Sequence, residues 1–369
     1  MREDVIQTDL GYAPSQPRFQ VSGLGPEFYC QSDSGVQRNE KIVKPKPVVL
    51  ALTCWLSLLA LLLPVASFGS DALPFPGRLG AVPKESGFAM KGWFVWCGAA
   101  IKVGDEYHLF ASRWPEATKF PEGYRANSEI VRAVASRPEG PYVFSEVVIG
   151  RRAAGKWDSG MAHNPAIYKT GDTFVLYYIG SDVGSRHRQI GIATAKAITG
   201  PWTRRDQPLD LGVASDANNP SACFEADGGV KLIWRTVDLR VCISAALSWS
   251  GPYTLVNSNV WPAAKLEDFF FFEHGGEYHV ICEDNIGQVT GHERWGAHLF
   301  SADGVTDWKP CREPVVYDHH IRWAGGGNFV ATRRERPWFL IEDGKPTHLF
   351  TAVYDGQHTW NQPVPIIPP

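Results

Sequence analysis

The fold of this chain is decided by the stretch His163-Asn164-Pro165-Ala166-Ile167-Tyr168, in which a polar pair leads into a short apolar strand. Further copies of the pattern open with Asn218-Asn219-Pro220, Glu267-Asp268-Phe269 and Glu335-Arg336-Pro337. Each copy is followed by a turn with glycine or acidic residues and then by a second strand rich in aromatic and β-branched residues. A pattern that returns along the chain indicates an architecture of repeated units.

The spacing of the copies identifies the repeated unit. The second residues of the polar pairs are separated by about 55, 49 and 68 residues, close to the roughly 50 residues of a four-stranded propeller blade. An earlier copy, without the polar pair, fits at residues 94–101. The chain is therefore predicted to fold as an all-β, five-bladed β-propeller.

Short strands, and no long helix, are indicated within each blade. In the second blade we expect strands at residues 173–178 and 189–194, and an outer strand after Gly200-Pro201-Trp202. Proline suits an edge strand because it lacks the N–H donor that a central strand needs. No long stretch keeps apolar residues at the spacing of an amphipathic helix. Short strands with regular turn signals indicate an all-β fold.

The last blade lacks sequence for four strands of its own. Only residues 359–364 could add a strand after residues 346–353. Because a ring needs closure, we expect residues 79–88 to supply the missing strand. A partly open last blade is the alternative.

The first 70 residues are expected to lie outside the propeller. Three lysines at 41, 44 and 46 precede an apolar run at 48–63, and small residues follow it. This order is typical of a secretory signal peptide, and the run is short for a membrane span. We predict an N-terminal extension plus signal peptide over 1–70, disordered or removed, and one propeller domain over 71–369. The predicted localisation is secreted or periplasmic, without membrane contact after cleavage; an uncleaved anchor is the alternative.

Composition and cysteine usage limit the expected ligands. The net charge is −3, and no basic stripe is evident, so nucleic acid is not an expected partner. Five cysteines follow the apolar run, an odd number without close pairs, which does not indicate a disulfide framework, although export would permit one bridge. No Cys-x-x-Cys or clustered histidine pattern indicates zinc, and we predict no metal ligands.

The polar pairs are the candidate site. In a propeller the first strand of each blade lines the central channel, so the pairs should converge on one face. Carboxylates from different blades suit glycoside cleavage, which uses one carboxyl group as general acid and another as base or nucleophile. Glu267 and Asp268 are neighbours, so only one of them faces the pocket unless a bulge intervenes. Equivalence with the earlier asparagines favours Asp268, and Glu335 competes with Arg336 in the same way. Inter-blade salt bridges are the alternative role.

Three residues are weaker candidates for catalysis. Asp158 lies in the loop that enters the second blade, where turn formation is the alternative role. Glu129 begins the third strand of the first blade. His163 could donate a proton or bind a substrate hydroxyl, and a structural role is its alternative.

These features resemble the five-bladed β-propeller glycoside hydrolases, the group of arabinanase/xylosidase-like, invertase-like and anhydro-galactosidase-like enzymes. The resemblance rests on the Asn-Pro and Glu-Asp strand entries, on the second strands near 104–110 and 276–280, and on the Gly-Pro-aromatic turns. It covers about residues 92–355. It implies cleavage of glycosidic bonds in a central pocket and does not identify a substrate.

The chain departs from the arabinanase-like enzymes at the catalytic positions. In those enzymes the first blade contributes an Asp base, the second an Asp that tunes a pKa and the third a Glu acid. Here the first-blade strand has no carboxylate, and the next two blades offer Asn164 and Asn219. The acids have either moved to the fourth and fifth blades and the loops, or the mechanism differs. The Glu267-Asp268 entry also resembles mannoside phosphorylases of this fold, although Phe269 replaces their proline.

We therefore predict an exported glycoside hydrolase that cleaves an oligo- or polysaccharide by carboxylate acid/base catalysis. The expected catalytic residues are Asp268, Glu335 and Glu267, assisted by Asp158, His163 and Glu129. The expected carbohydrate-binding residues are Trp96, Asn164, Asn219, Arg336 and Arg113. No cofactor is required, and the resemblance allows a structural Ca²⁺ or other ion in the channel. The alternatives are a non-catalytic carbohydrate-binding propeller and a glycoside phosphorylase.

Overall fold

The computed structural model describes residues 75, 77–214 and 216–368. In this part of the chain it contains 21 strands and one short helix, α1 (Tyr124–Asn127), which confirms the all-β prediction. The described helix is too short to cross a membrane. The predicted extension and signal peptide at 1–70 lie outside the described residues.

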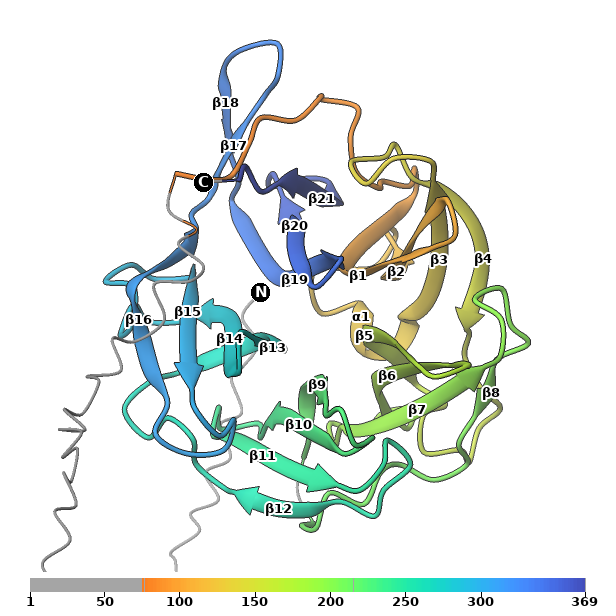
Figure 1. The fold of residues 1–369 in the computed structure, drawn as a ribbon. Helices are drawn as coiled ribbons and strands as arrows, with labels where there is room; N and C mark the ends of the chain where they lie inside the picture. Colours follow the sequence, from red (N-terminus) through yellow and green to blue (C-terminus); the bar gives the residue numbers. More distant parts are fainter. Residues whose placement is uncertain (1–74, 76, 215, 369) are drawn as a thin grey trace, which may run out of the picture. The chain divides into compact units, whose positions relative to one another are not determined.

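Five antiparallel sheets surround a central axis, which confirms the five-bladed propeller (Figure 1). The first blade contains β1 (Trp93–Val103), β2 (Glu106–Pro115), β3 (Glu129–Ala135) and β4 (Val143–Ile149). The second contains β5 (Met161–Thr170), β6 (Thr173–Ser181), β7 (Gln189–Ala195) and β8 (Thr203–Arg204). The third contains β9 (Asn218–Phe224), β10 (Val230–Arg235), β11 (Val241–Ala246) and β12 (Thr254–Asn257).

The fourth blade contains β13 (Leu266–His274), β14 (Glu277–Asp284), β15 (Trp295–Ser301) and β16 (Lys309–Tyr317). The fifth contains β19 (Arg333–Glu342), β20 (Lys345–Tyr354) and β21 (Thr359–Pro365). A hairpin of β17 (His320–Arg322) and β18 (Asn328–Val330) comes between these blades in the sequence. In every blade the first strand lies nearest the axis and the later strands lie farther out (Figure 1).

Residues 79–88 pair with the fifth blade, but they do not form the fourth strand that the sequence predicted. Phe88 and Asn361 exchange backbone hydrogen bonds of 2.9 Å, and the Gly80 N–H donates to the carbonyl of Pro365 at 2.7 Å. The segment contacts β21 through isolated bridges and forms no continuous strand, because the chain turns between them, where the Ser86 N–H donates to the Pro83 carbonyl. The ring is therefore closed by a segment that precedes the first blade.

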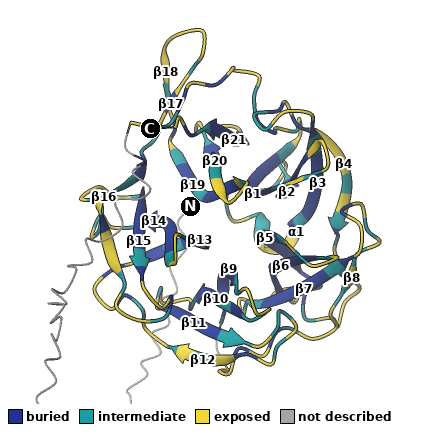
Figure 2. Ribbon diagram, viewed as in Figure 1, coloured by how far each residue is buried: buried dark blue, intermediate teal, exposed yellow. Residues whose placement is uncertain are grey.

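Burial is deepest in the strands nearest the axis, and exposed residues gather on the outer strands and loops (Figure 2). Below the polar pairs, aromatic rings line a pocket of about 420 Å³ around the axis. Trp338 lies 4.8 Å from Phe270 and 5.5 Å from Tyr168, measured between ring centroids, and its indole N–H donates to the Ala100 carbonyl at 2.9 Å. These contacts join four blades and hold the innermost strands at fixed positions around the axis.

The cysteines of the described residues are all buried and unbridged, which agrees with the absence of a disulfide framework. Burial raises the pKa of Cys97 and of Cys223 to about 12, so these thiols are not nucleophiles at neutral pH.

Candidate functional site

A ring of five residues with left-handed backbone surrounds the axis, one from each innermost strand. The members are Cys97, Asn164, Asn219, Asp268 and Arg336, with φ between 54° and 62°. The strand register shifts beside each of them, so every innermost strand carries a β-bulge at the same place. Positive φ is uncommon outside glycine and is often found at functional sites.

This ring confirms the equivalence that the sequence repeat predicted, and it adds Cys97 as the first-blade member. Together with the residues that follow them, the five ring residues line a channel of about 30 Å³. That volume holds about one water molecule. The ring is therefore too narrow for a sugar to pass through it.

The bulge in β13 resolves the ambiguity between Glu267 and Asp268. Asp268 lies on the channel, where its carboxylate is 2.6 Å from the Arg336 guanidinium and accepts a hydrogen bond from the Asn219 amide. Glu267 points toward the third blade and accepts a hydrogen bond of 2.5 Å from Arg235. Both carboxylates thus lie at the strand-entry side. Asp268 is held by residues of the third and fifth blades, and Glu267 is held by a residue of the third blade.

Carboxyl groups of the fourth and fifth blades gather beside the axis. Asp268, Glu283 and Glu335 are all buried, and one carboxyl oxygen from each lies within 4.8 Å of the others. Glu335 accepts hydrogen bonds from Arg294 at 2.6 Å and Arg333 at 2.5 Å. Arg294 also approaches Glu283 to 2.9 Å. The inter-blade salt bridges that the sequence allowed as an alternative are therefore present.

Glu283 is a member that the sequence reading did not select. It lies on β14, outside the repeated strand entry, and pairs directly opposite Glu267 in the sheet. An acidic residue near the end of the second strand of a blade can lie opposite the polar pair on the first strand, as Glu283 does. Predicting this position requires the register of the hairpin, which the repeat does not define.

The pKa values of the carboxyl groups beside the axis are shifted in opposite directions. Burial raises the pKa of Asp268 to about 7; Arg336 opposes this, while Glu267 and Glu335 add to it. Burial and the neighbouring Glu335 and Asp268 raise the pKa of Glu283 well above its usual value. For Glu267, burial is outweighed by Arg235 and Arg336, so its pKa is lowered. Groups with opposed pKa shifts in one site are what acid/base chemistry requires.

His163 is held as a neutral ring beside the channel. Burial, together with Arg336 and Arg188, lowers its pKa well below the usual value. Its Nδ1 is 2.8 Å from the Ser128 hydroxyl, and Tyr124 stacks on the ring at 4.6 Å. In the amide orientation that matches donors with acceptors, the adjacent Asn164 donates to His163 Nε2 at 3.1 Å and accepts from Arg336 at 2.6 Å. His163 is positioned to form hydrogen bonds in its neutral form.

Trp96 forms part of an aromatic wall next to the cluster. Its ring lies 5.2 Å from Phe120, and the Arg333 guanidinium lies 5.6 Å from its centroid. Phe120 also stacks on Tyr354 at 4.3 Å. Trp96 itself is 5% exposed, so its neighbours Phe120 and Tyr354 cover it.

The structure does not bring Asp158, Glu129 or Arg113 to the carboxylate cluster. Asp158 is fully buried in the second blade, where it accepts a hydrogen bond of 2.7 Å from Tyr178 and forms ion pairs with two arginines. Glu129 and Arg113 form an ion pair of 2.7 Å across β2 and β3. Because these groups already satisfy one another within their own blades, the structure gives no support to their predicted roles.

Four arginines join the site from positions outside the repeat. They are Arg188 before β7, Arg235 at the end of β10, Arg294 before β15 and Arg333 at the start of β19. The sequence reading had found only Arg336 and Arg113 as basic candidates. The four were missed because each lies in a loop or at a strand end, where only the fold brings it to the axis.

The carboxylate cluster does not suit a calcium ion as it is arranged. Its oxygen ligands are of the type that Ca²⁺ prefers. However, the Arg336 and Arg294 guanidiniums lie 2.6 to 2.9 Å from these oxygens and bring positive charge into the cluster, which a cation would have to displace.

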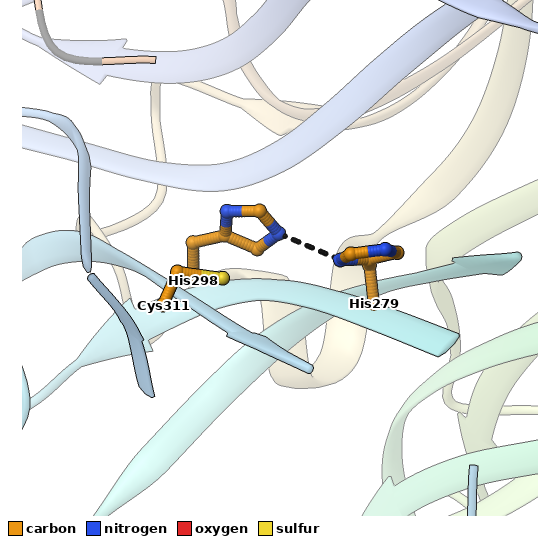
Figure 3. A group of neighbouring side chains, drawn as sticks. All are labelled: His279, His298 and Cys311. Atoms are coloured by element: carbon orange, nitrogen blue, oxygen red, sulfur yellow. Dashed lines mark hydrogen bonds between the residues drawn. The ribbon is translucent and has the colours of Figure 1, made fainter. Parts of the chain in front are cut away.

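A second group of ligand-type side chains lies within the fourth blade (Figure 3). His279, His298 and Cys311 come from three neighbouring strands, β14, β15 and β16, and are buried. The two imidazoles face each other, with Nδ1 of His279 3.1 Å from Nε2 of His298. Imidazole and thiolate are ligands that Zn²⁺ accepts. The sequence did not indicate this group because its members are spread over three strands.

Comparison with known proteins supports the expected resemblance at the level of the fold. No family model matches the chain. A probable arabinan endo-1,5-α-L-arabinosidase C from Aspergillus niger is 20% identical over 229 residues, which is 53% of this chain and 69% of the relative.

Two solved structures share the architecture. A family 117 glycoside hydrolase from the marine bacterium Zobellia galactanivorans has a TM-score of 0.55 and 14% identity, covering 78% of this chain and 88% of its own. The catalytic domain of a GH62 α-L-arabinofuranosidase from Coprinopsis cinerea has a TM-score of 0.55 and 12% identity, covering 78% and 96%. At this identity the comparison shows the fold that these chains have in common.

Proposed function

We propose that this protein is a glycoside hydrolase whose substrate binds on the strand-entry face of the propeller. The observation that carries the proposal is the carboxylate cluster at the axis, formed by Asp268 and Glu335 from adjacent blades, with Glu267 beside it. The fold shared with glycoside hydrolases and the opposed pKa shifts of Asp268 and Glu267 support it.

Asp268 is the proposed general acid. A pKa of about 7 leaves a large protonated fraction near neutral pH, and the residue lines the channel at the centre of the site. In this role Asp268 donates its proton to the glycosidic oxygen while the bond from that oxygen to the anomeric carbon breaks. It then takes a proton from the water that completes hydrolysis.

The partner carboxylate is Glu335 or Glu267. Carboxyl groups of retaining enzymes are about 5 to 5.5 Å apart, whereas inverting enzymes need roughly 6.5 to 9.5 Å. Oxygens of Asp268 and Glu335 lie within 4.8 Å, which favours retention with Glu335 as nucleophile. Glu335 would attack the anomeric carbon and form a glycosyl ester, which water then cleaves. Glu267 is the candidate if a water molecule must fit between the two groups.

The names of the related proteins suggest the first substrates to test. Because the relatives include an arabinan-cleaving enzyme and an arabinofuranosidase, arabino-oligosaccharides and aryl arabinofuranosides come first, followed by other aryl glycosides and algal oligosaccharides. We also propose export of the protein, supported by the apolar run at 48–63 and the lysines before it.

The decisive experiment compares three variants on the best substrate of that screen. Asp268→Asn and Glu335→Gln should each lower kcat/KM by at least about 100-fold. Asp238→Asn, an exposed carboxylate paired with Arg240, is the matched control and should leave activity unchanged. Full activity in both site variants, with melting temperatures equal to the wild type, would refute the assignment.

A non-catalytic carbohydrate-binding propeller is the second candidate. It is favoured by the ring residues of the first three blades, Cys97, Asn164 and Asn219, none of which carries a carboxylate. This function predicts saturable sugar binding by calorimetry without product release. It also predicts that Asp268→Asn has a small effect on affinity, since an amide can replace a carboxylate as a hydrogen-bond acceptor.

A further inference from the structure

Arg188 differs from the other arginines of the site in its partners. Its guanidinium donates to the Tyr124 hydroxyl at 2.7 Å and to the Asn218 amide oxygen at 3.2 Å. Both acceptors are neutral, and within residues 77–214 and 216–368 Arg188 forms no ion pair. The nearby carboxylate of Asp216 accepts a hydrogen bond from the Arg188 backbone N–H at 3.0 Å and lies against His187.

The surroundings of Arg188 are positively charged. Burial lowers its pKa, and the guanidiniums of Arg125, Arg235 and Arg336 lower it further. Arg235 and Arg336 are each paired with one carboxylate, Glu267 and Asp268 respectively. These two arginines thus have carboxylate partners, whereas Arg188 has none among the described residues.

A half-buried cation without a counter-charge is costly, because burial removes water that would otherwise solvate it. Proteins keep such charges where a ligand supplies the opposite sign. The guanidinium has five N–H donors, of which two are used by Tyr124 and Asn218. The remaining donors can bind an oxyanion through two parallel hydrogen bonds.

We propose that Arg188 forms an oxyanion-binding subsite at the edge of the carbohydrate site, an inference that rests on the proposed function. Its position follows from its partners: Asn218 belongs to the polar pair of β9, and Tyr124 stacks on His163 of the pair in β5. The anion is therefore bound next to the sugar. Two sources share this chemistry: a carboxylate or sulfate carried by the sugar, and free inorganic phosphate.

The test is a binding measurement that needs no turnover. Calorimetry of the wild-type protein should show that galacturonate or galactose 6-sulfate binds at least about tenfold more tightly than galactose, with a preference that falls as salt rises. Arg188→Gln should remove this preference, so that galactose and the two sugar anions bind with similar affinity. Arg240→Gln, which removes an exposed arginine paired with Asp238, is the matched control and should keep it. Arg188→Lys, which keeps the charge without the planar fork, should retain part of it.

The outcomes separate this inference from the proposed function. Anion binding that is lost in Arg188→Gln, in a protein that cleaves no glycoside, supports the subsite and refutes the hydrolase. Cleavage of neutral glycosides with equal affinity for galactose and galacturonate, and no binding of phosphate, supports the hydrolase and overturns the subsite. Binding of phosphate, but not of the sugar anions, with the same dependence on Arg188 assigns the subsite to free phosphate and predicts phosphate-dependent release of a sugar phosphate. Anion binding that persists in Arg188→Gln also overturns the inference.

Discussion

The carboxylate of Asp268 and the guanidinium of Arg336 meet at 2.6 Å from adjacent blades, and both residues have left-handed backbone at the same place in their strands. The pair therefore links the fourth and fifth blades at the axis. The pair also lies where the proposed reaction would occur, so changes to Asp268 should affect both the activity and the contact between the two blades.

The pH dependence of activity tests the role of Asp268. A general acid must be protonated, and its pKa is about 7 in the folded protein. We expect kcat/KM to fall as pH rises above about 7, by up to tenfold per pH unit. Initial rates between pH 5 and 9, with unfolding followed over the same range, measure this. A profile that instead rises through pH 7 would assign Asp268 as the base.

Replacement of the buried glutamates distinguishes Glu283, whose pKa is raised by burial, from Glu335, which is held by two arginines. Because burial raises the pKa of Glu283 well above its usual value, replacing its carboxyl group by a neutral amide in Glu283→Gln should change the free energy of unfolding by less than about 1 kcal/mol. Glu335→Gln leaves Arg294 and Arg333 without their shared carboxylate and should cost about 3 to 5 kcal/mol. Urea denaturation of both variants gives the comparison; equal losses would show that Glu283 is ionised.

Gly98 is required by the close approach of Asn361. A Cβ atom at position 98 would lie 2.0 Å from the Asn361 amide nitrogen, which is buried and donates to the Cys97 carbonyl at 2.7 Å. Gly98→Ala should therefore destabilise the protein by about 1 to 3 kcal/mol. Gly325→Ala, where a Cβ meets nothing within 4 Å, is the control and should be close to neutral. The melting temperatures of the two variants would contradict this account if they were equal.

The closure of the ring can be tested at Phe88. This side chain is 2% exposed, and its backbone pairs with Asn361 of β21. Phe88→Ala should cost about 3 to 5 kcal/mol, the usual loss for a buried phenylalanine. Lys84→Ala, an exposed change in the same segment, should have little effect. A small loss in Phe88→Ala would mean that the propeller is stable without this segment.

The repeat predicted the parts of the molecule that every blade shares. It gave the number of blades, the innermost strands and the equivalence of Asn164, Asn219, Asp268 and Arg336, since these depend on local pattern and spacing. It could also predict a short last blade, because too little sequence follows β20.

The repeat could not predict the groups that lie outside it. Glu283 depends on the register of the hairpin between β13 and β14. Arg188 and Arg294 are in connections, where length and direction vary from blade to blade. The orientation of Glu267 and Asp268 depends on a bulge, which changes the strict alternation of faces that a regular strand imposes. Tertiary pairing decides each of these cases.

The left-handed ring combines one shared backbone conformation with side chains of different chemistry. Its backbone geometry is common to all five blades, whereas the side chains on it are a thiol, two amides, a carboxylate and a guanidinium. Since the main chain adopts the same conformation under each of them, one member can change charge during evolution without altering the conformation of the other four. The backbone of the ring therefore does not decide the charge at any one position, and the contacts among the five side chains, such as that between Asp268 and Arg336, decide which charges are compatible.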